Sequence, residues 1–166
     1  AFADEGIVLR EKGITMPIVV LNADAGSFDK MIAHSLQPEI YSFPSLEDFV
    51  LSVERYGAHG YPIHIKLDTG MHRLGFVAEE VDELISRLKD NRSIRVASVF
   101  AHLACADDPS QDDFSREQIS LFDSLSRRIV DAMPYEVIRH IANSAAIERL
   151  PEAAFDMCRL GLALYG

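Results

Sequence analysis

Short apolar runs alternate with longer amphipathic segments along the whole chain. The runs fall at approximately Pro17–Asn22, Glu39–Phe43, Pro62–Asp68, Arg95–His102, Glu136–Asn143 and Asp156–Leu164, and a segment of helical period precedes each of them. This alternation predicts parallel strands joined by crossover helices. A long parallel sheet is usually covered by helices, either as an open doubly wound sheet or as a closed eight-stranded barrel.

Local signatures mark where several of the expected helices begin and end. Ser45 and Ser115 are each followed three residues later by an Asp or a Gln, which fits or approximates a capping box at a helix start. Gly13 and Gly57 stand where helices should stop, and Pro151 is expected to end a short helix.

The pattern favours a barrel, because no GxGxxG motif of a dinucleotide-binding sheet follows the first apolar run. The chain opens on "AFADEGIVLREKG", typical of a strand end that continues into a helix, and stops at "LALYG" with no helix covering the last strand. We therefore expect an α/β fold over residues 1–166, one truncated (β/α)8 TIM-type barrel domain. About six of eight parallel strands would be present, with the first strand and most of the second missing.

Composition narrows the class of protein. With 166 residues, 48% of them hydrophobic and 25% charged, the chain can bury the core of one globular domain. Its formal net charge of -10 repels phosphate backbones, which argues against nucleic acid as a partner. No apolar run reaches the roughly 20 residues that cross a bilayer, so we expect a cytoplasmic protein with no membrane partner.

The two cysteines, Cys105 and Cys158, lie far apart and outside any CxxC or His-rich context. This spacing predicts neither a disulfide framework nor a zinc site, and no metal is expected. Both are expected to be buried thiols, since free cysteine is often buried.

The stretch "IKLDTGMHRLGF" combines a strand pattern with several ionisable groups. Its apolar and polar residues alternate, so Lys66 and Asp68 lie on the face opposite to Ile65 and Leu67. The polar face must therefore point at something other than an apolar core.

Polar residues also end the later strands, where the carboxyl ends of barrel strands form the active face. Arg73 follows the strand just described, His102 follows the next one, Asn143 and Ser144 follow another, and Arg159 belongs to the last. Each also has a purely structural explanation: a core histidine, a helix N-cap, or an arginine in a surface ion pair. Their convergence at successive strand ends favours a site.

The last two strand ends match a known type of phosphate site. Loops after the final strands of such barrels, together with a helix N-terminus, commonly bind phosphate. Ser144 would add a hydroxyl donor, and Gly161 would let the backbone approach the ligand. Arg159 would face the ring that carries the phosphate; opposite a pyridine nitrogen it would keep that nitrogen unprotonated, because a guanidinium only donates.

Four motifs in register, "KLDTGMHRLGF", "HLACADD", "IANSAA" and "RLGLALYG", resemble the N-terminal barrel domain of alanine racemases. The likeness extends over essentially the whole chain, since "DEGIVLREKGITMPIVVLNA" also resembles that family. The resemblance implies pyridoxal phosphate (PLP) as cofactor, alanine as substrate, and D-alanine for peptidoglycan as product. It assigns catalysis to Lys66, Arg73 and His102, and cofactor binding to His102, Asn143, Ser144, Arg159, Gly161 and Leu162.

The resemblance also implies individual roles. Lys66 matches a lysine that the family often carries as a carbamate, whose charge orients the arginine at Arg73. Arg73 in turn would contact the phenolic oxygen of the cofactor and the substrate carboxylate. His102 matches a histidine beside the pyridine ring that supports Arg159, the arginine on the ring nitrogen.

Two groups of the family's active site have no match in this chain. By the resemblance, the lysine that binds the cofactor covalently lies upstream of Ala1, and a catalytic tyrosine lies downstream of Gly166, on the partner subunit. We therefore expect the 166-residue chain alone to be inactive. Its open sheet edges predict a homo-oligomer.

Other functions remain open at this point. Barrels of this type also serve broad-specificity amino acid racemases, basic amino acid decarboxylases and D-threonine aldolases. A different class of function is a binding module without catalysis, as in the PLP-homeostasis proteins. A β-rich continuation after Gly166 would favour the racemase. A scaffold barrel with no ligand leaves Lys66, Arg73, His102 and Arg159 unexplained.

Overall fold

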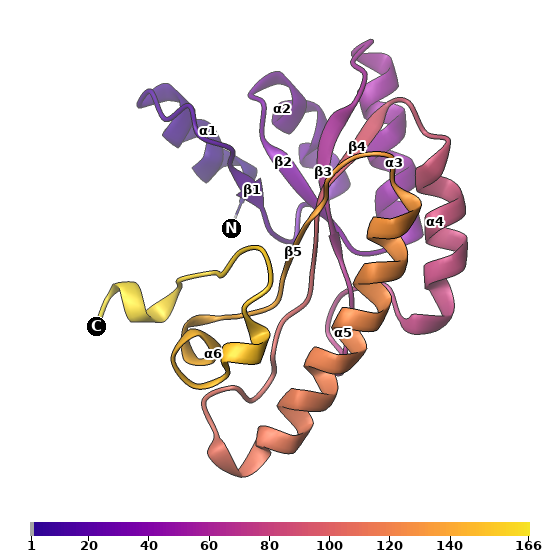
Figure 1. Ribbon diagram of the computed structural model, residues 1–166. Coiled ribbons are helices and arrows are strands. Elements are labelled where there is room, and N and C mark those ends of the chain that lie inside the picture. The colour runs from indigo at the N-terminus through magenta and orange to yellow at the C-terminus, as the bar shows by residue number, and fades with distance from the viewer. Residues whose placement is uncertain (1) are drawn as a thin grey trace.

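The computed structural model describes residues 2–166 and is built around a five-stranded parallel sheet (Figure 1). The strands are β1 (Val19–Val20), β2 (Gln37–Ile40), β3 (Tyr61–Lys66), β4 (Ile94–Phe100) and β5 (Ile138–His140), and they lie in the order β1-β2-β3-β4-β5. Each strand pairs with the next one along the chain, so the sheet advances in one direction, as in a barrel. A doubly wound sheet would reverse its strand order. The expected partial barrel is confirmed.

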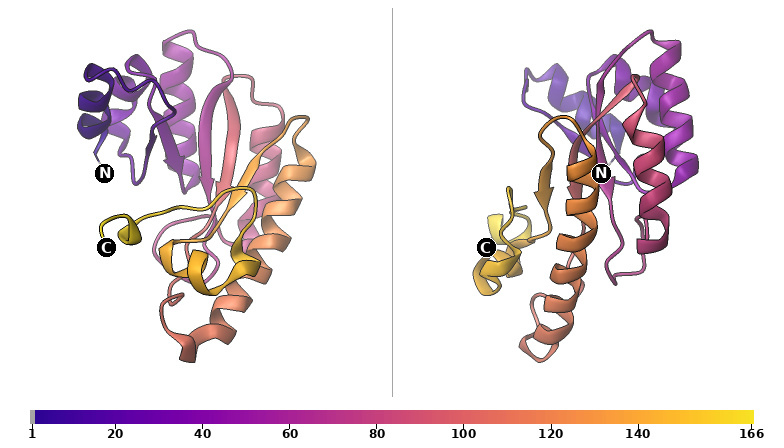
Figure 2. Two further views of the ribbon diagram at one scale, coloured as in Figure 1. Left: turned by 60° about the vertical axis from the view of Figure 1, so that its left-hand side comes forward. Right: turned by 45° about the vertical axis from the view of Figure 1, so that its right-hand side comes forward.

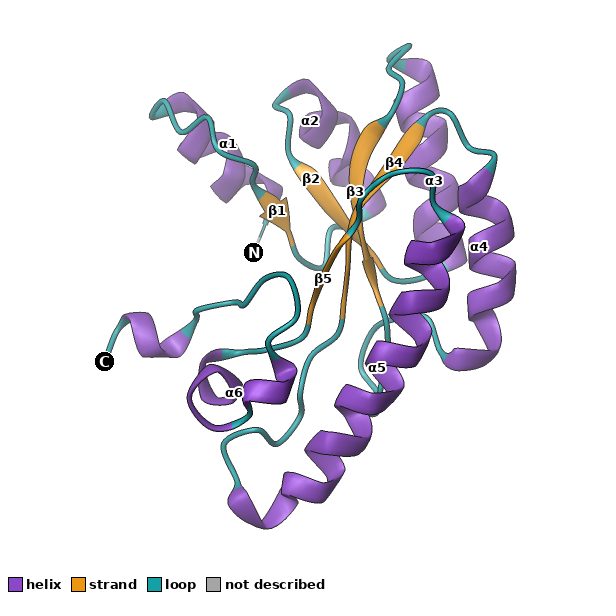
Figure 3. Cartoon of the chain, viewed as in Figure 1, coloured by secondary structure: helices purple, strands orange, loops and turns teal. Residues whose placement is uncertain are grey.

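Helices cover one face of this sheet. They are α1 (Ala3–Glu11), α2 (Phe28–Ala33), α3 (Phe43–Arg55), α4 (Val81–Lys89) and α5 (Asp112–Ala132). A further helix, α6 (Ser144–Arg149), follows β5. Figure 2 shows α3, α4 and α5 side by side along the sheet, and Figure 3 shows α6 at the end where β4 and β5 finish. The carboxyl ends of the strands therefore meet α6 and the C-terminal segment.

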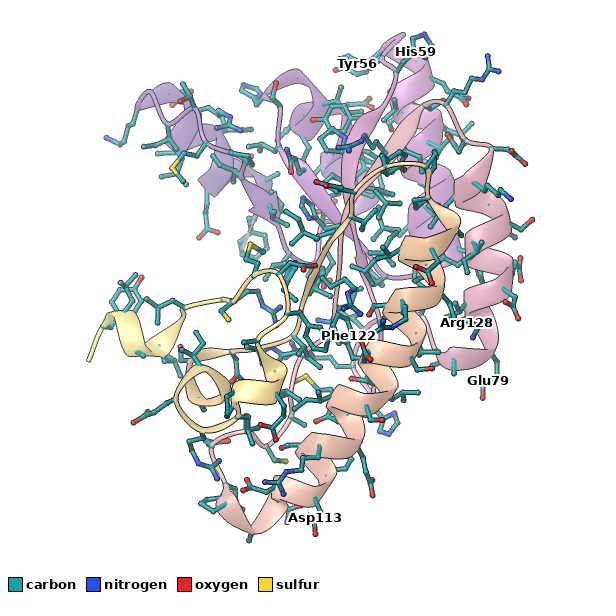
Figure 4. All side chains as sticks on the ribbon, viewed as in Figure 1. Tyr56, His59, Glu79, Asp113, Phe122 and Arg128 are labelled. Atoms are coloured by element: carbon teal, nitrogen blue, oxygen red, sulfur yellow. The ribbon has the colours of Figure 1, made fainter. Side chains whose placement is uncertain are left out.

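The main core lies between this outer face of the sheet and the helices. Ile63 and Ile65 of β3 are fully buried there, and they belong to one apolar cluster with Leu84 of α4 and Phe122 of α5. In Figure 4 Phe122 points from α5 toward the sheet, whereas Arg128 of the same helix lies at the surface. The opposite, inner face of the sheet is also buried but carries polar residues.

The sixth predicted strand, Asp156–Leu164, is not formed. The segment runs beside β5 and donates only two backbone hydrogen bonds toward it, from Asp156 N to Arg139 O and from Arg159 N to Ala142 O, each 3.0 Å long. Two isolated bonds do not make a ladder, and no further strand of residues 2–166 supports its other edge. The segment ends in a 3₁₀ turn.

The helix boundaries agree with the sequence signals in part. Gly13 and Gly57 follow the ends of α1 and α3 with φ of +85° and +63°, as predicted for residues after a helix C-cap. The N-cap of α3 is Ser42, whose hydroxyl accepts from Ser45 N, so the prediction that Ser45 caps the helix is wrong. Ser115 likewise lies inside α5, where its side chain is buried.

The burial predicted for the two cysteines can be compared with the fold. Cys105 is half-buried and Cys158 exposed, so the prediction of two buried thiols is wrong. Within the residues described, no helix has the length and apolar character that a bilayer crossing needs. The same residues contain no group of His, Cys, Asp or Glu side chains that could hold a metal ion.

Candidate functional site

A cleft of about 580 Å³ lies at the carboxyl ends of β4 and β5. It is lined by Leu21, His102, Leu103, Ala104, Asp107, Asn143, Ser144, Ala145, Arg159, Gly161 and Leu162. All six residues that were predicted to bind a cofactor are among them. A second cleft of about 540 Å³, lined by residues of α5 together with Arg139, Glu152 and Phe155, contains none of these six.

The guanidinium of Arg159 is held rigidly at the edge of the cleft. Nη1 donates to His140 Nδ1 at 2.7 Å and to its carbonyl at 3.3 Å. Nη2 donates to the carbonyls of Ala101 at 2.7 Å and Ile141 at 3.2 Å, and to His102 Nδ1 at 3.2 Å. Burial lowers the pKa of Arg159 to about 10, which leaves it charged at neutral pH. Its Nε–H has no partner within residues 2–166.

His102 begins the loop after β4 and is half-buried in the cleft wall. Burial, together with the charges of Arg159, Lys66 and Arg73, lowers its pKa to about 4. The imidazole is therefore neutral at pH 7, with Nδ1 as the acceptor for Arg159.

Asn143 and Ser144 connect the start of α6 to the neighbouring loops. Asn143 is the N-cap of α6: its Oδ1 accepts from Ala146 N at 3.0 Å, and its Nδ2 donates to Leu103 O at 3.4 Å. Ser144 Oγ accepts from Gly161 N at 2.9 Å and from Ala163 N at 3.3 Å. Both acceptor positions of this hydroxyl are thus filled, and its O–H proton has no acceptor within residues 2–166.

Lys66 lies on the inner face of β3 and pairs with a residue that the sequence did not single out. Its Nζ is 3.5 Å from Glu39 Oε1 of β2, and the two side chains are 8% and 3% exposed. Nζ also lies 4.9 Å from the ring centre of Phe100. Burial lowers the pKa of Lys66, and the carboxylate of Glu39 opposes this shift.

Arg73 does not make the contact with Lys66 that the resemblance implied. It is exposed on the loop after β3 and forms no hydrogen bond or ion pair within the described residues. Its charge lowers the pKa of Lys66, as expected for two cations near each other. Asp68 accepts from Gly70 N at 2.9 Å and His72 N at 3.0 Å and so shapes this loop instead of facing the cleft.

The loop needs a glycine at its end. Gly75 has φ of +131°, and a Cβ there would lie 2.5 Å from the backbone of Leu67 and Asp68. The chain returns at this point, because Phe76 N donates to Lys66 O at 2.9 Å. The "IKLDTGMHRLGF" stretch is therefore a strand followed by a closed loop with Arg73 on it.

Four buried polar residues of the inner face were missed by sequence analysis as functional candidates: Glu39, His64, Ser98 and His140. Glu39, His64 and Ser98 each lie on a strand between apolar neighbours, which is the signal that alternation offers, whereas His140 lies between Arg139 and Ile141. The sequence does not show which of them meet, because that depends on the register between strands.

Comparison with known proteins gives a consistent result. The sequence model of the family described as "Alanine racemase, N-terminal domain" matches residues 1–166. The alanine racemases of Sorangium cellulosum and Carboxydothermus hydrogenoformans are 36% and 38% identical to it, over all of this chain and 45% of each relative. The chain thus spans less than half the length of these curated relatives.

Solved structures show the same likeness. The alanine racemase of Clostridium difficile 630 superposes with a TM-score of 0.89 at 31% identity, over all of this chain and 43% of the other. Its complex with cycloserine gives a TM-score of 0.90 at 30% identity and covers 46% of that chain.

Proposed function

Because this chain belongs to the alanine racemase family, whose N-terminal domain it matches over residues 1–166, we propose that its whole protein interconverts L-alanine and D-alanine with PLP. The observation that carries the proposal is the cleft at the ends of β4 and β5, which gathers all six predicted cofactor-binding residues. The curated relatives carry the name alanine racemase, which favours racemisation over decarboxylation or a purely binding role.

The donor groups of the cleft fit a phosphate at the start of α6. The O–H of Ser144 has no acceptor in the fold, because its oxygen already accepts from two backbone N–H groups. The first N–H groups of a helix have no partners within it, and here Asn143 satisfies that of Ala146 alone. Ser144 and Leu162 would therefore donate to the phosphate. Gly161, whose N–H donates to Ser144, would let the backbone approach it, and Asn143 would fix the position of α6.

The donor set on the other side of the cleft fits a pyridine nitrogen. The Nη1 and Nη2 groups of Arg159 donate to five acceptors, whereas its Nε–H remains available to donate to a ligand. A permanent donor at this place leaves the ring nitrogen unprotonated. When bound, PLP supplies the electron-accepting ring that stabilises negative charge at the α-carbon of an amino acid.

The remaining polar residues would hold the substrate and the charges around it. Arg73 is exposed and has no hydrogen-bond or ion-pair partner among residues 2–166, so its guanidinium is available for the alanine carboxylate. Neutral His102 supports Arg159 through Nδ1. Lys66 would act on Arg73 through its charge, and its modification state sets the sign of that charge.

The proposal extends to partners and location. We expect a cytoplasmic homodimer whose product, D-alanine, enters peptidoglycan. Exposed apolar side chains at the two ends of the sheet, Met16 at 71% and Leu160 at 57%, support further association of the whole protein. Sedimentation of the whole protein checks this, and a monomer at micromolar concentration would contradict it.

Turnover of alanine by the whole protein tests the proposed function. We expect the purified protein, stripped of PLP, to interconvert D- and L-alanine only after PLP is added, as measured by the optical rotation of the solution. The Arg116→Ala variant, changed in the second cleft, serves as a control that keeps activity. Release of CO2 without racemisation, or no reaction at saturating PLP, would contradict the proposal.

A further inference from the structure

A continuous chain of hydrogen-bonded side chains crosses the inner face of the sheet and ends at the cleft. Gln37 Oε1 lies 2.7 Å from His64 Nε2, and His64 Nδ1 lies 2.6 Å from Ser98 Oγ. Ser98 Oγ lies 3.0 Å from His140 Nε2, and His140 Nδ1 lies 2.7 Å from Arg159 Nη1. The strands β2, β3, β4 and β5 each contribute one link, in their order in the sheet.

Strand register brings the central links together. His64 is the direct neighbour of Ser98 across the β3–β4 pair, after a register shift between Ile63 and His64. Ser98 is 1% exposed and does not line the cleft. The face of the His140 imidazole is also held in place, because the ring stacks on Phe100 with the two ring centres 5.0 Å apart.

Arg159, at one end of the chain of side chains, determines where every proton along it lies. Arginine can only donate, so His140 Nδ1 accepts from Arg159 and the proton of this neutral imidazole lies on Nε2. That Nε2–H donates to Ser98 Oγ, and the serine proton is then free to donate to His64 Nδ1. His64 in turn donates from Nε2 to Gln37 Oε1.

This arrangement requires that both imidazoles are neutral, and their surroundings agree. Burial lowers the pKa of His64 to about 4 and that of His140 to about 3. A doubly protonated His140 would point an N–H at a guanidinium. A neutral one with its proton on Nδ1 would make the same clash, so one tautomer alone satisfies both of its neighbours.

We propose that Ser98 is a positioning residue, whose hydroxyl fixes the tautomer of His64 and the position of the His140 ring, and thereby the orientation of Arg159 at the cleft. This inference rests on the proposed function in one respect, namely that Arg159 faces the cofactor ring. Ser98 touches neither the cleft nor Arg159 and acts through His140.

Other buried serines of the chain do not have this property. Ser115 is fully buried, and its hydroxyl has no hydrogen-bond partner. Ser126 is also buried, and its hydroxyl donates at 3.4 Å to the carbonyl of Asp123, a residue of the same helix. Ser98 differs in that it joins two titratable side chains from two other strands.

Nitrogen NMR of the whole protein, labelled with 15N-histidine, tests the proposal without PLP. We expect the wild type to show His64 and His140 each as a single neutral tautomer with the proton on Nε2. In Ser98→Ala, His140 keeps this tautomer because Arg159 still donates to it. His64 loses the serine donor, and because the amide of Gln37 can turn to offer its N–H groups in place of its oxygen, His64 becomes a tautomer mixture. Ser98→Thr retains the hydroxyl and is expected to restore one tautomer.

Ser115→Ala is the matched control, because it removes a buried hydroxyl that takes no part in the hydrogen-bonded network. The imidazole signals of this variant should equal those of the wild type. A wild-type spectrum with either ring charged at pH 7, or with the proton of His140 on Nδ1, would overturn the proposal even if no variant folds. Unchanged His64 signals in Ser98→Ala would overturn it as well.

A second arm separates this inference from the proposed function. In the PLP-loaded whole protein, Ser98→Ala should lower kcat severalfold with a smaller change in KM, and shift the absorbance of the bound cofactor. If PLP does not bind at all, the proposed function fails while the NMR result still stands. If PLP binds and neither kcat nor absorbance changes, only the positioning role fails.

Discussion

The two faces of the sheet are formed by alternate residues of the same strands, yet different forces hold them. On the outer face, Ile63 and Ile65 pack against helices in an apolar core. On the inner face, His64 and Lys66 are almost as deeply buried but satisfy their polar atoms with side chains from the neighbouring strands. One strand therefore serves stability with its odd positions and the site with its even ones.

The largest change is expected where a charge on the inner face loses its partner. Glu39→Gln leaves the ammonium of Lys66 buried without a counter-ion and should lower the free energy of unfolding by about 3 kcal/mol. The double variant Glu39→Gln/Lys66→Met should be less destabilised than the sum of the two single variants. Urea unfolding of all four proteins measures this, and strict additivity would show that the pair is not coupled.

Shortening a buried side chain on the outer face should lower the free energy of unfolding by a similar amount, for a different reason. Ile65→Ala leaves a cavity at a fully buried position and is expected to cost about 3 kcal/mol of unfolding free energy. Leu51→Ala, at a side chain that is 55% exposed, is the control and should cost less than about 0.5 kcal/mol. Equal losses in the two variants would mean that Ile65 is not in the core.

Acid should weaken the inner face while leaving the outer one intact. Burial lowers the pKa of His64 and His102 to about 4 and of His140 to about 3, from 6.5 in an exposed imidazole. Between these values the unfolded chain binds more protons, so this stability is complete above pH 6.5 and is lost as the pH falls toward 4.

We expect the free energy of unfolding to drop by on the order of 3 kcal/mol from pH 7 to pH 5, with His102 counted less because it lines the cleft. Urea unfolding at the two pH values measures this drop. His59→Gln, at an exposed imidazole, should give the same drop as the wild type. An unchanged stability at pH 5 would indicate that folding does not lower the pKa values of these three imidazoles.

The smallest effect is expected for an ion pair of equal length on the surface. Lys30 Nζ lies 3.5 Å from Asp4 Oδ1, the same separation as in the Lys66–Glu39 pair, but its side chains are 63% and 76% exposed. Water and salt screen such a pair, so Asp4→Asn should not measurably change the unfolding transition. A loss as large as that of Glu39→Gln would show that distance, and not burial, decides the strength.

Much of the sheet and the cleft could be predicted from sequence because both follow local rules. Alternation of period two located β3 and β4, and the rule that active groups follow barrel strands selected His102, Ser144 and Arg159. The sixth strand was wrongly predicted, because a strand needs a neighbouring edge that its own sequence does not specify.

The inner-face network could not be predicted, because it depends on pairing between strands. The predicted strand began at Glu39, whereas β2 begins at Gln37. Gln37, the end of the hydrogen-bonded chain, therefore fell outside the predicted strand. The register shift before His64 places this ring opposite Ser98, and no local pattern marks it. The signal that a sequence offers for such a network is a polar residue at an alternating position of a predicted strand that is otherwise apolar.

The central claim is that the cleft at the ends of β4 and β5 holds PLP, and a crystal structure of the whole protein with PLP tests it most directly. We predict phosphate density within hydrogen-bonding distance of Ser144 Oγ and the ring nitrogen next to Arg159, with no covalent bond to Lys12, Lys30, Lys66 or Lys89. Cofactor bonded to Lys66, or bound away from Arg159, would contradict the claim.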